Sequence, residues 1–241
     1  PANHPPVANS DTHAVLEDGT LNISAANGVI RGSTDGSVAD SDVDNPVTSL
    51  VVSGVVAGTG SVTQGAGVGT SIEGTYGHLT LNADGSYKYV ADKADALAAG
   101  VPAVDTFTYT DHDPSGAVSN TATLKITVTG VNDAAVITGD TTGTIAALGG
   151  INNSQSSPVY GIARGDLNAT DVDGPNDAWQ AASSNTANGY GWYMIDGAGK
   201  WNYGLYENNA TVQGPKEKQT TLTHSFTVYN GGGTATKATD P

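Results

Sequence analysis

Aspartate recurs at every second position in two stretches of the chain. VADSDVDNP (38–46) contains Asp40, Asp42 and Asp44, and ATDVDGP (169–175) contains Asp171 and Asp173. Carboxylates this close together repel one another in water, whereas a hard divalent cation binds a cage of about six to eight such oxygens. The spacing therefore indicates a Ca²⁺ site. Mg²⁺ is less suitable, because octahedral cages made only of protein ligands are unusual for it.

The charge of the chain is strongly negative. The 24 acidic residues outnumber the 9 basic ones, which gives a net charge of −15, and 20 of the acids are Asp against 4 Glu. An excess of Asp suits turns and oxygen ligands for a cation. The scarcity of Lys and Arg argues against binding to nucleic acid or to anionic membrane surfaces. No stretch approaches the roughly 20 apolar residues of a membrane span, so we expect no membrane insertion.

Other metal chemistry and catalysis find little support in the sequence. The chain has no Cys, which removes thiol catalysis, disulfides and Cys-based zinc sites, and its 5 His are scattered without zinc-ligand spacing. The sequence offers no defensible Ser-His-Asp triad, no phosphate loop and no metal-hydrolase helix motif. A glycosidase carboxylate pair is the alternative, but the aspartates lie in turn and linker contexts that calcium explains. We therefore expect a protein without enzymatic activity.

Short strands are the elements that must position these aspartates. The chain has 32 Gly, and its runs of Val, Ile, Thr and Tyr are bounded by Gly, Asn and Asp, which is typical of an all-β protein. YGHLTLNADGSYKY (76–89) and YGWYMIDGAGKWNY (190–203) align without a gap, and each predicts a hairpin with Gly in its turn. Further matches in the same order indicate two copies of one domain, residues 1–133 and 134–241.

Each copy is predicted to be a seven-stranded β-sandwich of the immunoglobulin or cadherin kind, with the two copies in an elongated tandem. In the first copy the expected strands are about 7–17, 20–31, 48–54, 76–82, 86–91, 105–110 and 120–129. The second copy ends at TATKATDP, so we expect its last strand to be short or incomplete.

Loops in such a sandwich alternate between its two ends, which predicts two groups of ligands. At one end of the first copy we expect Asp40, Asp42 and Asp44 beside Asp111 and Asp113. This end can bind sugar through calcium, or it can be the socket for a preceding domain. At the junction of the two copies we expect calcium ligands from Glu17, Asp92, Asn132, Asp133, Asp171 and Asp173.

The junction resembles that of cadherins, in which an early Glu, a linker with Asn and Asp, and an Asp-x-Asp of the next domain bind calcium. Here Glu17, the VND at 131–133 and the Asp-x-Asp at 171–173 match those positions. The Leu-Asp-Arg-Glu motif of cadherins is absent, and Asp92 is the substitute for it.

The closer resemblance is to the cadherin-like and VCBS repeats of large secreted bacterial adhesins. It rests on EDGTLNI, DSDVDN, YGHLTLNADGSYKY, DTFTYTD and ITVTGVNDA in the first copy and on GDLNATDVDG, GAGKWNYGLYENNATVQ and LTHSFTV in the second. A pair of about this size is similar to the Rap (Rhizobium-adhering) proteins, secreted calcium-binding lectins that recognise acidic exopolysaccharide. The resemblance implies a secreted or bacterial cell-surface protein with an acidic polysaccharide as partner, and we expect a monomer.

The three Trp of the chain all lie in the second copy and are candidates for stacking on sugar rings. Trp192 aligns with His78, which the strand alternation puts on the outer face of the sandwich. Trp201 aligns with Tyr87, and Trp179 falls where a strand should enter the core. Core packing is the competing interpretation for all three.

Two hypotheses for function follow. The first is a calcium-dependent adhesin or lectin that binds acidic exopolysaccharide or capsular polysaccharide in a biofilm matrix. The second is a passive extender of a larger RTX-type adhesin, stiffened by calcium between its domains. A surface Trp patch beside a groove favours the first, and a smooth polar surface favours the second.

Overall fold

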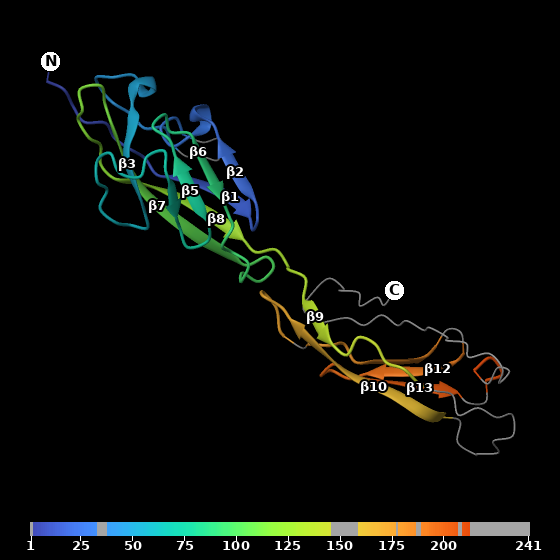
Figure 1. Ribbon diagram of the computed structural model, residues 1–241. Coiled ribbons are helices and arrows are strands. Elements are labelled where there is room, and N and C mark those ends of the chain that lie inside the picture. The colour runs from blue at the N-terminus through green and yellow to red at the C-terminus, as the bar shows by residue number, and fades with distance from the viewer. Residues whose placement is uncertain are drawn as a thin grey trace. The chain divides into compact units, whose positions relative to one another are not determined.

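The computed structural model describes residues 2–32, 38–145, 159–176, 178–186, 189–206 and 209–212. These residues form strands and two short 3-10 turns with no α-helix among them, and the all-β prediction is confirmed. The chain divides into two compact units, unit 1 (residues 1–131) and unit 2 (residues 132–241). The predicted junction at 133/134 lies close to this division. Figure 1 labels most of the strands of both units.

Unit 1 is a sandwich of two four-stranded sheets (Figure 1). One sheet has the order β1 (Asp11–Leu16), β8 (Ala122–Thr129), β7 (Pro102–His112) and β3 (Val51–Ala57). The other has the order β2 (Thr20–Ile23), β6 (Tyr87–Val90), β5 (His78–Leu81) and β4 (Ser71–Glu73). β1 runs parallel to β8, and the remaining neighbours are antiparallel.

The prediction of seven strands in the first copy missed β4. This strand is only three residues long and follows a Gly-rich stretch, so no apolar alternation marks it in the sequence. It pairs with β5, where Ser71 lies opposite Thr80 and Glu73 opposite His78. The second predicted strand is also shorter than expected, because the chain enters a 3-10 turn at Ala25–Asn27.

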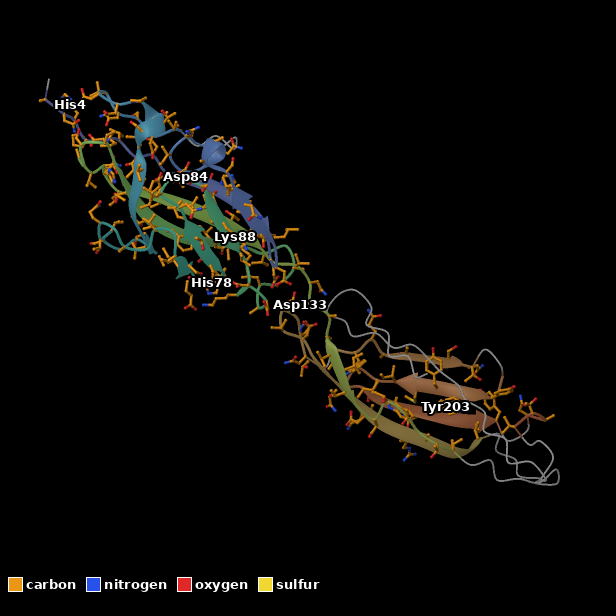
Figure 2. The ribbon with its side chains drawn as sticks, turned by 45° about the horizontal axis from the view of Figure 1, so that its top comes forward. His4, His78, Asp84, Lys88, Asp133 and Tyr203 are labelled. Carbon is orange, nitrogen blue, oxygen red and sulfur yellow. The ribbon has the colours of Figure 1, made fainter. Side chains whose placement is uncertain are left out.

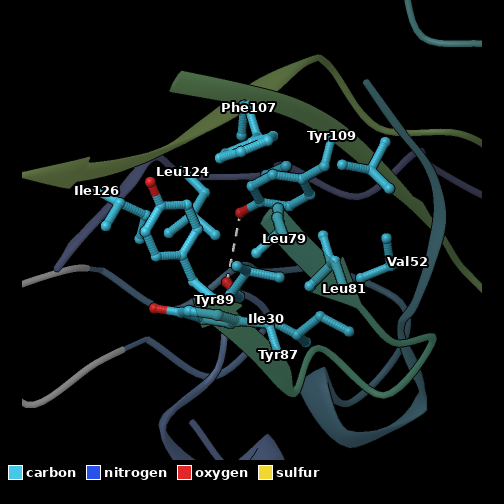
Figure 3. Packing of buried hydrophobic residues seen from close by; sticks show 14 of the residues in the cluster. Ile30, Val52, Leu79, Leu81, Tyr87, Tyr89, Phe107, Tyr109, Leu124 and Ile126 are labelled. Atoms are coloured by element: carbon cyan, nitrogen blue, oxygen red, sulfur yellow. Dashed lines mark hydrogen bonds between the residues drawn. The ribbon is translucent and has the colours of Figure 1, made fainter. Parts of the chain in front are cut away.

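The core of unit 1 forms where the inward faces of the two sheets meet (Figure 3). On β5 and β6 every second side chain is buried, as the alternation of strand residues requires. Tyr89 of β6 packs edge to face against Phe107 of β7, with ring centroids 6.2 Å apart. The hydroxyl of Tyr109 also lies 3.4 Å from the Val29 carbonyl oxygen, the contact drawn as the dashed line in Figure 3. Buried aromatic rings thus tie the two layers together.

One carboxylate in this core is fully hydrogen-bonded. Asp105 of β7 is 2 % exposed and accepts hydrogen bonds from the Thr75 and Tyr76 backbone N–H groups at 2.7 and 3.0 Å and from the Tyr89 hydroxyl at 2.6 Å. Three donors satisfy the buried charge, so Asp105 stabilises the loop before β5 without needing a cation.

The described residues of unit 2 form one five-stranded sheet. Its order is β11 (Ala182–Asn185), β12 (Gly191–Ile195), β13 (Lys200–Tyr206), β10 (Val159–Thr170) and β9 (Val136–Gly139). Trp179, Ile195 and Trp201 belong to a small buried cluster against it. The predicted strand at HSFTV (224–228) and the last strand expected at TATKATDP (234–241) both lie outside the described residues.

The hairpins predicted from the sequence repeat are present in both units. β5–β6 and β12–β13 have the same register, with Leu81 opposite Tyr87 in unit 1 and Ile195 opposite Trp201 in unit 2. The turn glycines Gly85 and Gly199 have φ angles of 83° and 82°, a left-handed conformation that favours glycine. The repeated hairpin is therefore a structural repeat as well as a sequence repeat.

Candidate functional site

The N-terminal segment of unit 1 lies against the first aspartate loop. Val7 and Ser41 exchange two backbone hydrogen bonds of 2.8 and 3.0 Å. Two residues further along, the Asn9 backbone N–H donates to Asp40 Oδ1 at 2.6 Å, and its side-chain amide donates to the Ala39 carbonyl at 2.9 Å. The loop is thereby held at the end of the sandwich where β1 begins and β7 ends.

Four aspartates are buried at this end of unit 1. Their exposed fractions are 2 % for Asp11, 3 % for Asp40, and 0 % for both Asp111 and Asp113. They come from the start of β1, the loop before β3, and the end of β7 and the turn after it. The sequence prediction placed Asp40, Asp111 and Asp113 in one group, and the structure brings these three to the same end of the unit.

Asp111 and Asp40 have buried side-chain oxygens without a described hydrogen-bond donor. Neither oxygen of Asp111, nor Oδ2 of Asp40, has a hydrogen-bond partner among the described residues. Burial, together with the charges of Asp111 and Asp11, raises the pKa of Asp40 from its ordinary 3.8 to about 9. Two adjacent buried carboxylates with only one described donor between them, the Asn9 N–H, are costly when both are charged, so the pair needs either a proton or a cation.

The buried tyrosine of β7 lines the same cluster. The Tyr109 hydroxyl lies 2.7 Å from the Asn9 carbonyl oxygen and 3.0 Å from Asp11 Oδ2. Burial and the charges of Asp40 and Asp11 raise the pKa of Tyr109 well above its ordinary value, so the hydroxyl stays neutral. It therefore supplies a hydrogen bond but no positive charge to balance the aspartates.

The rim of the cluster is paired with the N-terminal residues. The His4 backbone N–H and ring Nδ1 lie 2.7 and 2.8 Å from Asp44 Oδ2, and hydrogen bonding by the ring holds the pKa of Asp44 below its ordinary value. The Asn3 amide donates to Asp113 Oδ2 at 2.6 Å and lowers the pKa of Asp113. Asp42 Oδ1 caps the loop by accepting the Asp44 N–H at 2.7 Å.

The chemistry of the cluster fits Ca²⁺ better than any other common metal. Every candidate ligand is a carboxylate or amide oxygen, which a hard cation prefers, and the orphaned oxygens of Asp111 and Asp40 are buried acceptors that lack a donor. Within the described ranges, no three His, Cys, Asp or Glu side chains already converge in a group that could hold a metal ion. Binding would therefore require these side chains to turn toward a common ion.

Sequence reasoning missed several residues of this cluster. Asp11 is the most important, because it is buried beside Asp40 and lies at the first position of a strand. Asn3, His4 and Asn9 were also missed as partners of the aspartates. The signal was the resemblance of ANHPPV at the N-terminus to VNDAAV at 131–136, which puts Asn3 and His4 at the positions of Asn132 and Asp133.

The other predicted ligands of unit 1 have protein partners. Glu17 is 6 % exposed, and its Oε2 accepts the Val131 backbone N–H at 2.7 Å. Asp92 is exposed, and its Oδ1 lies 2.7 Å from Nδ1 of His78. Their predicted role in a calcium site at the junction stays a prediction.

The second aspartate loop repeats the geometry of the first within unit 2. Asp171 Oδ1 accepts the Asp173 and Gly174 backbone N–H groups at 3.3 and 2.9 Å, as Asp42 does for its own loop. Asp173 Oδ1 in turn accepts the Asp133 backbone N–H at 3.2 Å. Asn132 donates its amide to the Asp133 carbonyl at 2.6 Å. In both units, therefore, an aspartate loop accepts a backbone hydrogen bond from the segment that leads into the unit.

The three tryptophans differ in accessibility. Trp179 and Trp201 are 6 % and 4 % exposed and belong to the buried cluster of unit 2. The indole N–H of Trp201 donates to the Asp140 carbonyl at 2.7 Å. Trp192 is half-buried, and its strand position puts it on the face of β12 opposite Ile195, where its ring lies against Gly204. Of the three, Trp192 therefore has the ring best placed for a ligand.

No described helix is long and apolar enough to cross a membrane. No curated protein matches the chain. The crystal structure of the protocadherin GammaB4 extracellular domain is similar with 12 % identity and a TM-score of 0.38, over 84 % of this chain and 26 % of that one. The N-terminal eight immunoglobulin domains of the Down syndrome cell adhesion molecule give 8 % identity and a TM-score of 0.32, over 87 % and 24 %. The chain thus spans about a quarter of the length of each structure, and TM-scores this low carry no argument.

The family comparison covers the sandwich of unit 1. Residues 3–130 match the bacterial cadherin-like domain, a range that begins at Asn3 and ends with the exit from β8. The matched range contains every residue of the buried aspartate cluster. The chain therefore belongs to the bacterial cadherin-like domain family.

Proposed function

We propose that this chain is an extracellular, calcium-binding adhesion protein whose unit 1 is stabilised by Ca²⁺ at the buried aspartates. The observation that carries the proposal is the pair Asp40 and Asp111, which are buried with three oxygens that no described donor satisfies. A bacterial cadherin-like domain supports an adhesion role outside the cell. The bacterial cadherin-like family is generally non-catalytic, and no enzymatic activity is part of the proposal.

The residues that would hold the ion are those of the cluster and its rim. Asp11, Asp40 and Asp111 supply buried carboxylates, and Asp113 supplies a carboxylate now held by the Asn3 amide. Bound Ca²⁺ would supply the positive charge that the buried carboxylates lack, through oxygen ligands at about 2.3–2.6 Å. The gain in stability comes from the folded state, since the unfolded chain does not keep these residues together.

Calcium titration with calorimetric melting tests this part of the proposal. We expect the melting temperature of unit 1 to be several degrees higher in millimolar Ca²⁺ than in chelator. All three Trp lie in unit 2, so Trp fluorescence reports the melting of unit 2 separately. A melt of unit 1 that is the same in both conditions would contradict calcium binding at the cluster.

The proposed partner is an acidic bacterial polysaccharide. Support for sugar binding comes from Trp192, whose ring lies on the outer face of β12 and can stack on the C–H face of a sugar. Calcium can bridge protein carboxylates to uronate groups, which would allow a protein of net charge −15 to bind a polyanion. The finer assignment, in which unit 2 is a VCBS repeat and the pair is of the Rap kind, rests on the motifs of the sequence.

Binding to an acidic exopolysaccharide with Ca²⁺ and then with chelator tests the lectin function. We expect retention with Ca²⁺, and weaker retention for Trp192→Ala than for the wild type. The matched control is Tyr193→Ala, the neighbouring strand residue on the opposite face. Equal retention by both variants would remove Trp192 from the binding surface.

A structural extender is the second candidate function. The observation that favours it is the burial of Trp179 and Trp201, which leaves two of the three candidate aromatic residues in the core. An extender needs calcium for stiffness and no sugar ligand. A lower melting temperature in chelator, together with no retention on any acidic polysaccharide, would favour this function over the lectin.

A further inference from the structure

Unit 1 carries a polar hollow on the outer face of its second sheet, away from the aspartate cluster. It has a volume of about 380 Å³ and is lined by Ser71, His78, Thr80, Lys88, Val90 and Asp92. This volume is near the lower end of the range of small-molecule sites, about 300–1,000 Å³. Figure 2 labels His78 and Lys88 among the side chains of this unit.

The strand register arranges the polar groups of this face in rows. Lys88 of β6 lies opposite Thr80 of β5 and Asn22 of β2, and Thr80 lies opposite Ser71 of β4. The row across all four strands is therefore two hydroxyls, one ammonium and one amide. In the adjoining row, His78 lies opposite Val90 and Glu73. All these side chains point outward, because the residues between them, such as Leu79 and Tyr89, are buried.

Lys88 is an available positive charge in a very acidic unit. The described part of unit 1 has four basic residues, Arg31, Lys88, Lys93 and Lys125. Lys93 is paired with Glu73, whereas Lys88 forms no ion pair with any described carboxylate and is exposed. An exposed ammonium beside hydroxyl and amide groups suits a ligand that carries a carboxylate and several hydroxyls.

The orientation of His78 supports a sugar hydroxyl as the second contact. Its Nδ1 lies 2.7 Å from Asp92 Oδ1, and an ionised carboxylate can only accept a hydrogen bond. With Nδ1 directed at Asp92, Nε2 is the ring nitrogen left for a ligand, and a sugar hydroxyl can pair with it because a hydroxyl both donates and accepts hydrogen bonds. Asp92 is a positioning residue here, and Val90 is the apolar side chain that lines the hollow.

We propose that the outer face of β4, β5 and β6 binds a uronic acid unit through Lys88, His78, Thr80 and Ser71, without calcium. The proposal rests on the proposed function as a polysaccharide-binding protein, and it names a contact surface for that ligand. The carboxylate of the uronate would lie at the Lys88 ammonium, and its ring hydroxyls would contact the hydroxyls of β4 and β5. Because the site uses an ammonium in place of a metal ion, its binding does not require Ca²⁺.

Titration of the full chain with trigalacturonate, followed by NMR and calorimetry in chelator, tests the proposal. We expect amide shifts at His78 and Thr80, and binding about tenfold weaker for the methyl-esterified trisaccharide and for Lys88→Glu. Lys88→Arg keeps the charge and should retain binding. Lys125→Glu makes the same charge change on β8 of the other sheet, and should alter the affinity by less than about twofold. Thermal melting checks that each variant is folded.

The outcomes separate this site from the proposed function. Equal losses for Lys88→Glu and Lys125→Glu would overturn the site, because net charge alone would then explain them. Binding that needs Ca²⁺ and is insensitive to Lys88→Glu would also overturn the site, while leaving the calcium-dependent lectin function in place. No binding of trigalacturonate or acidic polysaccharide under either condition would overturn both.

Discussion

His4 and Asp133 occupy equivalent positions in the two units. The His4 backbone N–H donates to Asp44 in unit 1, and the Asp133 backbone N–H donates to Asp173 in unit 2. Each residue follows an asparagine, Asn3 and Asn132. Unit 1 therefore has an imidazole where unit 2 has a carboxylate, and this difference should weaken calcium binding at the rim of the cluster in unit 1.

Replacing His4 by a carboxylate should strengthen calcium binding by unit 1. His4→Asp removes the ring that pairs with Asp44 and adds an oxygen ligand at the same place, so we expect about a tenfold gain in Ca²⁺ affinity. Calorimetric titration measures it. Lys125→Gln makes the net charge more negative on β8 and is the control for a general electrostatic effect. An equal gain for both variants would show that His4 has no special role.

Asp111 and Asp105 should respond in opposite ways to the same substitution. Both are buried, but Asp105 accepts three hydrogen bonds, and Asp111 has no described donor. In chelator, Asp111→Asn should stabilise unit 1 by about 1–2 kcal/mol, because it removes a buried charge and adds a donor beside Asp40. Asp105→Asn should destabilise unit 1 by about 1–3 kcal/mol. Chemical unfolding in chelator measures both.

The two variants should also differ in their response to calcium. Asp111→Asn removes a ligand and should abolish most of the calcium-induced stabilisation, whereas Asp105→Asn should keep it. Two results would be inconsistent with these roles. One is an Asp105→Asn variant that is more stable than the wild type in chelator. The other is an Asp111→Asn variant that Ca²⁺ stabilises as much as it stabilises the wild type.

The stability of unit 1 in chelator should fall as the pH rises. Asp40 has a pKa of about 9 in the folded unit and an ordinary value of 3.8 when exposed. Between these values the folded state holds a proton that the unfolded state has released, so stability is greatest at the low end and is lost up to about pH 9. Urea unfolding at several pH values in chelator measures the slope. A stability that is constant across this window would contradict the buried carboxylate pair.

The tryptophans of unit 2 should separate into core and surface residues. Trp201→Ala should destabilise unit 2 by about 3–5 kcal/mol, since the ring is buried and its N–H is hydrogen-bonded. Trp192→Ala should cost less, because its ring is half-buried on the other face. Fluorescence of the remaining Trp residues measures both. An equal loss of stability in the two variants would mean that the two rings are packed equally well, which would contradict this prediction.

The sequence was sufficient for the strands that show alternation and for the hairpins with a turn glycine. β5 and β6 could be predicted because buried Leu79 and Tyr89 alternate with polar residues. β4 could not be predicted, because three residues beside a Gly-rich stretch are too few to show an alternation of apolar and polar residues. Its place in the sheet is set by its pairing with β5. Such a strand forms because a neighbouring strand pairs with it, and the sequence of the strand itself does not show this.

The candidate site was predictable in part for a similar reason. Asp40 and Asp111 stand out by spacing, and loop alternation put them at one end of unit 1. Asp11 lacked such a signal, because a single Asp at the start of a strand is common, and its burial becomes visible only once β1 lies beside β8 with Tyr109 against the carboxylate. The sequence also gave no means of distinguishing Asp105, whose three donors come from β6 and the loop before β5.

Ca²⁺ titration of the wild type and of Asp111→Asn, followed by the melting of unit 1, tests calcium binding at the buried aspartates most directly. Calcium binding at the buried aspartates predicts a rise of several degrees for the wild type and little or no rise for the variant. An equal rise in both would mean that calcium binds elsewhere. No rise in the wild type would mean that a proton alone resolves the buried charge of Asp40 and Asp111, which would contradict calcium binding by unit 1.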